Sequence, residues 1–571
     1  MTGSRLNEAE NTAVEVNTIR EGYRIVAARG SLIFSVIASL AFINPMYQYS
    51  LFELKDQVSK ILRKTEKRDG LADRLSLLTS DITKSLYNVI CPGLFEKDKV
   101  LFSFMMAAKI NIKANIISET DWHYFTDDVI TSIGIISDNL PLPEDLRAYG
   151  FSEKSWASAL MLAYSMPIAF KGLIADLTSI GICSEWARFF QSDSPHTDDL
   201  PEEWERRLSS FHRLLLVKTI KEDRTVFAMK KYIIDNIGYS FCDSATFDLE
   251  DVCCNSIAVT PFIIILSPGD DPMDSFLQVA ENQGKSGKCL RMISMGRGQG
   301  PAAEKAIERA HLSGDWVYLQ NCHLALSWLP KLEQIVDKMQ RDPGSVNSNH
   351  RLWITSMPTI LFPVSVLQVG IKIAYESPKG IKSKLMRTFQ TISEEEYNCC
   401  SKKDIYKKLL FTTAFFHALI LERRKYGAAG WNIPYDWTNG DLKAALIQVK
   451  MFIETQDSIP WESLNISLSD VTYGGRVTDV LDKRMISAML KKYYSPPLLD
   501  ESYTFTQDGV HFAPICPDLS AVRAYIQQLP SEDNLDLFGL HPNASISYQQ
   551  RESRALLTAG GKSLPPLLFI A

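Results

Sequence analysis

The strongest constraint on the fold is residues 315–323, an apolar segment that ends in amides. Its run of Trp, Val, Tyr and Leu fits a buried strand of a parallel sheet, and such sheets hold their ligands at the carboxyl ends of the strands. At this end the chain presents Gln320 and Asn321, where a nucleotide hydrolase needs a carboxylate for Mg²⁺. Amides carry no charge, so they neither hold Mg²⁺ tightly nor polarise an attacking water. The segment therefore predicts the sheet of a nucleotide hydrolase without its chemistry.

A second apolar run, residues 261–266, precedes a short loop and an amphipathic stretch at 273–280. Strand, tight turn and helix follow in the order of a phosphate-binding unit. Such a loop needs free backbone N–H groups, two glycines and a lysine at fixed spacing. This one has two prolines, which donate no N–H, and two aspartates, which repel phosphate. We therefore expect no bound triphosphate, and a turn with Asp271 or Asp274 near the helix N-terminus. The degenerate Walker A position comprises Ser267, Gly269, Asp270 and Asp271, and the degenerate Walker B position Gln320 and Asn321.

Two glycine-containing segments match nucleotide-binding motifs only in part. Residues 284–286 read Gly-Lys-Ser like the end of a P-loop, but Val279 stands where that motif needs its first glycine. Residues 296–300 carry three alternating glycines before a helix predicted at 301–310, which is the wrong spacing for a dinucleotide site. We predict a polar loop at the first segment and a close-packed turn at the second. Anion binding at the N-terminus of the predicted helix stays open.

Four long segments together resemble the sixth AAA+ module of a dynein heavy chain. In chain order they are SPGDDP (267–272), SMGRGQGPAAEKAI (294–307), WVYLQNCHLALSWLPKLE (316–333) and RLWITSMPTILFPVSVLQ (351–368). Flanking segments extend the resemblance over almost the whole chain. The segment that leads out of the fifth module is matched by residues 29–34, 44–51 and 93–97. The lid of the sixth module is matched by segments within 415–435 and 473–479, and the start of the C-terminal domain is matched by 538–544.

The resemblance implies an α/β fold: a AAA+ P-loop-like parallel sheet flanked by helices, with a helical lid and mainly helical flanking regions. The implied domains are the end of the fifth module (1–135), an acidic, loop-rich connection with helices entering the sixth module (136–254), the large subdomain of that module (255–395), its lid (396–498) and a truncated C-terminal domain (499–571). The apolar, proline-broken end at 564–571 is expected to be poorly packed.

The function implied is that of a C-terminal part of the motor ring of an axonemal dynein heavy chain, a minus-end-directed microtubule motor for ciliary movement. This part would be a non-hydrolysing block that relays ring closure. It would bind no cofactor, and ATP and Mg²⁺ would serve the full-length motor. The implied partners are the other AAA+ modules, dynein light and intermediate chains, and microtubules only through a stalk that this chain lacks. The implied location is the cytoplasm, the cytoskeleton and the axoneme.

Two other classes stay open. One is a free-standing ATPase that uses unorthodox residues, and the other is a regulatory or assembly fragment that binds dynein light or intermediate chains without motor activity.

The resemblance also gives roles to residues outside the loop and the strand end. The predicted strand at 351–356 ends in Thr355 and Ser356, where active AAA+ proteins sense the γ-phosphate; with no phosphate expected, we interpret both as hydrogen-bonding strand ends. Arg423 or Arg424 could reach a neighbouring nucleotide, but a solvated or interdomain salt-bridge face is our preferred interpretation. Arg476 is predicted to anchor the lid to the C-terminal domain through Asp479. Where the family usually continues with Asp and Trp after this aspartate, the chain has Val-Leu at 480–481.

Composition excludes several other classes. A net charge of −6 with scattered Lys and Arg predicts no general nucleic-acid binding. The ten cysteines form no C-x-x-C pair and the nine histidines show no metal-ligand spacing, so we expect reduced thiols and no metal site, with His323 packing against its neighbours or capping a strand end. The longest apolar stretch, 31–43, is about 13 residues, against about 20 for a bilayer span. We predict a buried helix there and no membrane association.

Helical periodicity accounts for much of the N-terminal half. Residues 1–28 form a weakly amphipathic pattern, and 52–135 repeat apolar residues on one face; these include Leu75, Leu78, Ile82 and Leu86. Residues 140–204 are predicted to be loop-rich and acidic toward their end. A helix is predicted at 206–220, leading into the sheet.

Overall fold

The computed structural model describes residues 2–65, 70–126, 141–148, 151–178, 184–192, 194–242, 249–254, 256–268, 270–500, 502–530 and 533–563. They fall into two compact units. The first comprises Met1–Ser267, Asp271–Tyr375 and Glu552–Ala571, and the second comprises Pro268–Asp270 and Glu376–Arg551. Gly269 of the Walker A position, residues 127–135 of the predicted helical region and the terminal segment 564–571 lie outside the described residues.

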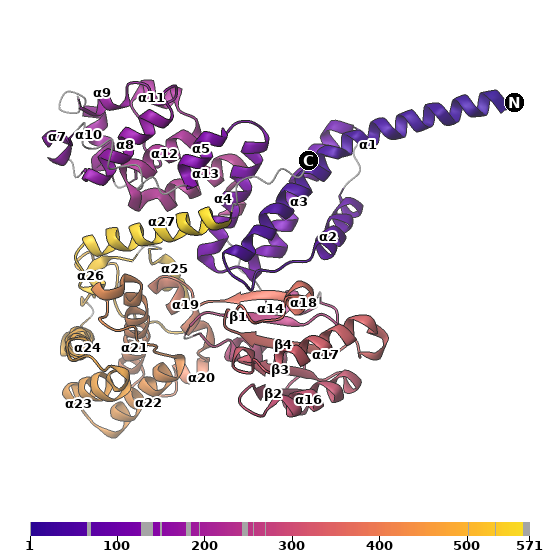
Figure 1. The fold of residues 1–571 in the computed structure, drawn as a ribbon. Helices are drawn as coiled ribbons and strands as arrows, with labels where there is room; N and C mark the ends of the chain where they lie inside the picture. The colour runs from indigo at the N-terminus through magenta and orange to yellow at the C-terminus, as the bar shows by residue number, and fades with distance from the viewer. Residues whose placement is uncertain are drawn as a thin grey trace. The chain divides into compact units, whose positions relative to one another are not determined.

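The N-terminal part of the first unit is helical (Figure 1). Its first helices are α1 (Thr2–Ser39), α2 (Leu51–Lys64), α3 (Leu71–Ile90), α4 (Glu96–Lys113) and α5 (Glu119–Thr126). The helices predicted at 1–28 and within 52–126 are therefore confirmed. The periodic residues Leu78, Ile82 and Leu86 are buried in the core, whereas Leu75 packs against it half-buried. Apolar residues at helical spacing thus place one face of α3 inside the unit.

The expectation of a loop-rich segment at 140–204 is wrong for the residues that the structure describes there. They include α7 (Glu144–Ala148), α8 (Glu153–Ser165), α9 (Leu173–Thr178), α10 (Ser184–Gln191) and α11 (Glu202–Arg207). The helix predicted at 206–220 is interrupted, because α11 ends at Arg207 and α12 (Ser210–Ile220) starts anew. Ser209 caps α12, its hydroxyl accepting a hydrogen bond from the His212 N–H at 3.2 Å. Helices α13 (Thr225–Ile237) and α14 (Leu249–Cys254) follow.

Within the described residues, one segment of this unit, Arg20–Phe42, is long and apolar enough to cross a membrane by length and composition alone. A core helix of a soluble protein passes the same test. The segment buries Val26, Ile33, Val36, Ile37 and Leu40 in the core of the unit, where α1 packs on α3 and α4. The buried helix predicted at 31–43 thus continues α1 as far as Ser39 and ends in a 3₁₀ turn.

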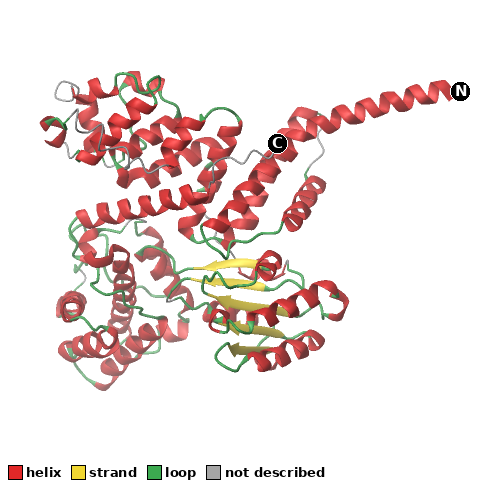
Figure 2. Ribbon diagram, in the orientation of Figure 1, coloured by secondary structure: helices red, strands yellow, loops and turns green. Residues whose placement is uncertain are grey.

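Five parallel strands form the sheet of the first unit (Figure 2). They are β1 (Phe262–Leu266), β2 (Leu290–Ser294), β3 (Trp316–Gln320), β4 (Arg351–Ser356) and β5 (Ile371–Tyr375), in the order β2-β3-β4-β1-β5. The strands predicted at 261–266, within 315–323 and at 351–356 are β1, β3 and β4, which form the interior of the sheet. Because all strands run parallel, their carboxyl ends lie along one edge.

Helices cover both faces of this sheet. Alternate residues point to opposite faces of a strand, and the buried side chains divide accordingly. Ile263, Val317 and Ile354 pack in one cluster with α16 (Gly300–Ser313), α17 (Leu329–Arg341) and α18 (Val364–Val369). Phe262 and Trp353 pack in another with α14 and α15 (Met273–Asn282). The fold class predicted from the sequence, an α/β sheet flanked by helices, is confirmed.

The second unit is helical and has its own core. Its helices are α19 (Ile381–Thr391), α20 (Glu394–Tyr397), α21 (Lys403–Arg423), α22 (Asn439–Thr455), α23 (Trp461–Ile466), α24 (Val480–Tyr493), α25 (Leu519–Gln528) and α26 (Leu535–Phe538); α27 (Asn543–Ser563) begins in this unit. Helix α21 is the most buried of them, with apolar residues on every side. A helix that is apolar all round belongs at the centre of a bundle, and α21 occupies that place.

Candidate functional site

The loop after β1 is held by its own chain. The Ser267 N–H donates to the Tyr375 carbonyl at 3.1 Å, which extends the pairing of β1 with β5. The Asp271 carboxylate accepts a hydrogen bond from the Met273 N–H at 3.0 Å, at the start of α15. In the second unit, the Asp270 carboxylate accepts from both the N–H and the hydroxyl of Ser377. The turn with Asp271 at a helix N-terminus is therefore confirmed, and a carboxylate occupies the N–H group that a phosphate would need.

The end of β3 is joined to the end of β4. Asn321 adopts the left-handed conformation with φ 55° and ψ 47°, which asparagine tolerates better than most residues. Its N–H donates to Thr355 Oγ1 at 2.9 Å. The Gln320 carbonyl accepts from the Met295 N–H at 2.8 Å. The structure thus brings the Walker B position and the sensor position together, at the ends of two neighbouring parallel strands.

The polar groups at the end of β4 are used within the protein. Thr355 and Ser356 are both buried. The Ser356 hydroxyl donates to the Met357 carbonyl at 2.8 Å, and the Met357 N–H donates to His323 Nδ1 at 3.1 Å. The interpretation of Thr355 and Ser356 as hydrogen-bonding strand ends is confirmed, and so is that of His323 as a strand-end cap.

Tyr318, in the middle of β3, was not singled out from the sequence. Its ring stacks on Phe276 of α15 with centroids 4.1 Å apart, and its hydroxyl is buried without a hydrogen-bond partner among the described residues. Burial, and then the charge of Asp271, raise the pKa of Tyr318 well above its ordinary value. The sequence signal that could have identified Tyr318 is its hydroxyl, which lies between apolar residues of the strand.

A nucleotide with Mg²⁺ does not fit these residues. The loop offers carboxylates to the phosphates, the metal position offers amides, and the sensor hydroxyls are already engaged. In the part of the chain that the structure describes, no group of three or more His, Cys, Asp or Glu side chains could hold a metal ion.

The nine cysteines in that part are all free thiols.

The glycine segment before α16 is a turn, as predicted, but it is close-packed only at Gly300, since residues 296–299 are exposed. Gly298 has φ 81°, and a Cβ on Gly300 would lie 2.6 Å from the Trp328 side chain, so only glycine fits there. Trp328 donates its indole N–H to Glu304 at 3.1 Å. An indole and a carboxylate therefore lie near the first turns of α16, where an anion would have to bind.

The two arginines of the second unit's charged cluster differ from each other. Arg423 is buried, and it donates to the carbonyls of Gly430, at 2.8 Å, and Phe538. Arg424 forms an ion pair with Asp436 at 2.5 Å. The preferred interpretation as a salt-bridge face is confirmed for Arg424 and wrong for Arg423, which serves as a buried support for two backbone segments.

The prediction that Arg476 acts through Asp479 is wrong. Arg476 donates to the Asp441 carboxylate, at 3.2 Å from Nε and 3.1 Å from Nη2. Asp479 instead caps α24, accepting from the N–H groups of Leu481 and Asp482. Capping a helix satisfies backbone groups that have no other partner. Asp479 therefore binds the first N–H groups of α24 and not the guanidinium of Arg476.

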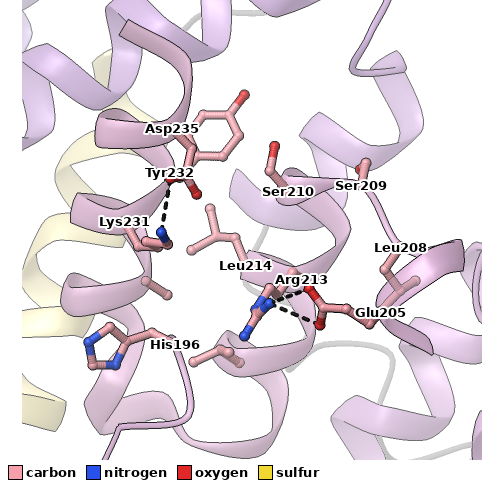
Figure 3. A pocket seen from close by; sticks show the side chains of 12 residues that line it. His196, Glu205, Leu208, Ser209, Ser210, Arg213, Leu214, Lys231, Tyr232 and Asp235 are labelled. Atoms are coloured by element: carbon pink, nitrogen blue, oxygen red, sulfur yellow. Dashed lines mark hydrogen bonds and ion pairs between the residues drawn. The ribbon is translucent and has the colours of Figure 1, made fainter. Parts of the chain in front are cut away.

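A cavity of about 180 Å³ lies among the helices of the first unit (Figure 3). It is lined by polar and apolar side chains of α11, α12, α13 and the connection between α11 and α12, with His196. Two ion pairs border it: Arg213 with Glu205 at 2.8 Å, and Lys231 with Asp235 at 3.0 Å. These residues were not predicted as a site from the sequence, because they match no metal, nucleotide or catalytic motif.

A five-stranded parallel sheet in this order, followed in sequence by a helical unit and with a strand–turn–helix at the phosphate position, defines a AAA+ P-loop-like α/β fold. Two family models match the chain. The dynein heavy chain region D6 P-loop domain matches residues 257–374, and the dynein heavy chain AAA lid domain matches residues 406–544. The chain belongs to the dynein heavy chain family.

The individual proteins to which the chain is similar are also dynein heavy chains. The chain is 36% identical to the human dynein axonemal heavy chain 6 over 579 aligned residues, covering 97% of this chain and 14% of the relative. It is 36% identical to the human dynein axonemal heavy chain 1, covering 97% and 13%. It is 33% identical to the Chlamydomonas reinhardtii dynein-1-beta heavy chain of the flagellar inner arm I1 complex, covering 96% and 12%. The chain thus spans about one seventh or less of the length of these relatives.

Proposed function

We propose that this chain acts as a non-hydrolysing block in the motor ring of an axonemal dynein, where it relays closure of the ring between modules that do bind ATP. The whole motor would use ATP and Mg²⁺ and move along microtubules toward their minus ends. Its location would be the cytoskeleton of the cilium, in line with the axonemal and flagellar names of the relatives. Its partners would be the remaining AAA+ modules and the dynein light and intermediate chains.

One observation carries the proposal: Thr355 Oγ1, at the sensor position, accepts the N–H of Asn321, at the Walker B position, at 2.9 Å. A nucleotide-dependent module must change its sensor contacts with the γ-phosphate. Here the sensor hydroxyl is committed to the neighbouring strand, and the strand end that would hold Mg²⁺ is uncharged. The shape of such a block cannot be switched by its own ATP, which suits it to transmit movement.

The test is equilibrium binding of a fluorescent ATP analogue to the purified chain, with and without Mg²⁺. We expect no saturable binding up to millimolar nucleotide. Restoring a carboxylate with Asn321→Asp provides a matched variant, and we expect no gain of binding from this change alone because the β1 loop still repels phosphate. Saturable, magnesium-dependent binding by the unchanged chain would refute the proposal and favour the free-standing ATPase.

A further inference from the structure

A pair of arginines precedes a serine at the border of the cavity in Figure 3. The sequence there is Arg206-Arg207-Leu208-Ser209, with arginines three and two residues before a hydroxyl. The chain's other adjacent arginine pair, at 423–424, is followed by Lys and Tyr. We propose that Ser209 is phosphorylated by a serine/threonine kinase whose acidic substrate groove recognises the two arginines, and that the phosphate draws Arg213 away from Glu205.

The location of Ser209 suits a kinase substrate. Leu208 and Ser209 form the non-helical connection between α11 and α12, and both are half-buried, while Ser210 is exposed. Helix α11 has six residues, too few for independent stability. Arg207 donates to the Ile168 carbonyl at 3.1 Å and stacks over Trp204 at 4.8 Å. These contacts have to open for the segment to extend in a kinase groove, at a modest cost in free energy.

The surroundings of Ser209 favour a phosphate after the transfer. Ser209 is the N-cap of α12, an eleven-residue helix, so the phosphate would lie at the positive end of the helix. Ser209 and Arg213 both line the cavity, together with Lys231 and His196. Burial, and then the charge of Arg224, lower the pKa of His196, with Arg213 and Lys231 acting in the same direction. Three cationic or ionisable side chains, those of Arg213, Lys231 and His196, therefore border the space that the phosphate would enter. The carboxylates of Glu205 and Asp235 also line it, each paired with one of these cations.

The same phosphate changes an existing ion pair. Arg213 Nη1 contacts both carboxylate oxygens of Glu205, at 2.8 and 3.0 Å, and Glu205 also accepts from the Leu200 N–H at 3.0 Å. A dianionic phosphate repels Glu205 and competes for the guanidinium. The modification thus loosens the segment 198–205 while it stabilises the start of α12.

The reaction is a phosphoryl transfer from ATP. Ser209 Oγ forms a bond with the γ-phosphorus, the bond from that phosphorus to the β,γ-bridging oxygen breaks, and ADP leaves. The hydroxyl proton passes to the catalytic base of the kinase. The products are ADP and phosphoserine 209.

The first experiment incubates the full chain with the catalytic subunit of an arginine-directed kinase and Mg-ATP, and maps the phosphate by peptide mass spectrometry. We expect incorporation at Ser209, its loss in Ser209→Ala and its retention in Ser210→Ala. Arg206→Gln combined with Arg207→Gln should lower the initial rate at least tenfold. An absence of phosphate at Ser209 in the folded chain overturns the proposal.

The second experiment tests the contact with Arg213. In the phosphorylated chain, ³¹P NMR reports the second pKa of phosphoserine, which is about 6 when unperturbed. We expect it to lie lower in the unchanged chain and to return toward 6 in Arg213→Gln. Lys443→Gln, a lysine of α22 in the second unit, serves as the control and should have no effect. Equal titration of the phosphate in all three chains refutes the proposed exchange of Arg213 between Glu205 and the phosphate.

Discussion

His417 is a titratable side chain held in the centre of an apolar helix. It is buried in α21, and neither ring nitrogen has a hydrogen-bond partner among the described residues. The hydroxyl of Tyr473, whose ring lies 5.9 Å from that of His417 between centroids, is buried and unpartnered as well. Burial lowers the pKa of His417 to about 4, although Asp441 opposes the shift. The neutral imidazole is therefore the form that the folded chain accepts.

This shift predicts a loss of stability in mild acid. A histidine whose pKa is lower in the folded than in the unfolded chain is neutral in both states well above pH 6.5, and the folded state then has its full stability. As pH falls from 6.5 toward 4, the unfolded chain binds the proton first, so the free energy of unfolding decreases. The slope is about 1.4 kcal/mol per pH unit for one proton. Between pH 6.5 and 5 we expect the unchanged chain to lose about 2 kcal/mol more unfolding free energy than His417→Leu. Urea unfolding at both pH values measures this difference, and parallel losses in the two chains would contradict it.

The hydrogen-bond partners of some side chains could be predicted from the sequence, and those of others could not. The chemistry of Asp271, Thr355 and His323 was predictable, because each lies beside a strand or helix end whose backbone groups need partners. The partners of Arg423 and Arg476 were not, because the Phe538 carbonyl and Asp441 are 115 and 35 residues away along the chain. Contacts at such separations depend on packing that no local pattern encodes.

At the scale of elements, the interior strands of the sheet were predictable and its edges were not. β1, β3 and β4 are buried along most of their length, so each contains at least three consecutive apolar or aromatic residues. The edge strand β2 is largely exposed, and β5 carries Lys372, so neither has the pattern of a buried strand. The short helices within 144–207 were missed because most have fewer than nine residues, too few for periodicity to stand out.

The link between β3 and β4 allows a test at this scale. In Thr355→Val the methyl group replaces the hydroxyl, and the Asn321 N–H loses its acceptor. An unpaired donor costs about 1–3 kcal/mol when it is buried. Asn321 is half-buried, so we expect urea unfolding to show a loss near the lower end of that range. Thr355→Ser keeps the acceptor and is the matched control, with a smaller loss from the missing methyl group. Equal stability of the valine and serine variants would show that the hydrogen bond contributes little.

For the whole molecule, the boundary between the sheet domain and the lid remains a prediction. The sequence analysis set it at 395–396, whereas the second compact unit resumes at Glu376 and contains α19. Ile381, Leu385 and Phe389 of α19 are buried in the core of that unit. Phe505, Val522 and Phe538 are buried in the same core, in line with the lid model's extension to residue 544. We therefore propose a lid that begins near 376 and ends near 544.

Two fragments distinguish these boundaries. The fragment Glu376–Arg551 retains the core, and we expect a cooperative thermal transition by circular dichroism. The fragment 396–551 lacks the three α19 side chains, each worth about 2–5 kcal/mol in a packed core. Their combined loss is comparable with the whole stability of a typical domain, about 5–15 kcal/mol, so the shorter fragment should show no cooperative transition. If both fragments melted alike, α19 would not be part of the lid, and the boundary at 395–396 would stand.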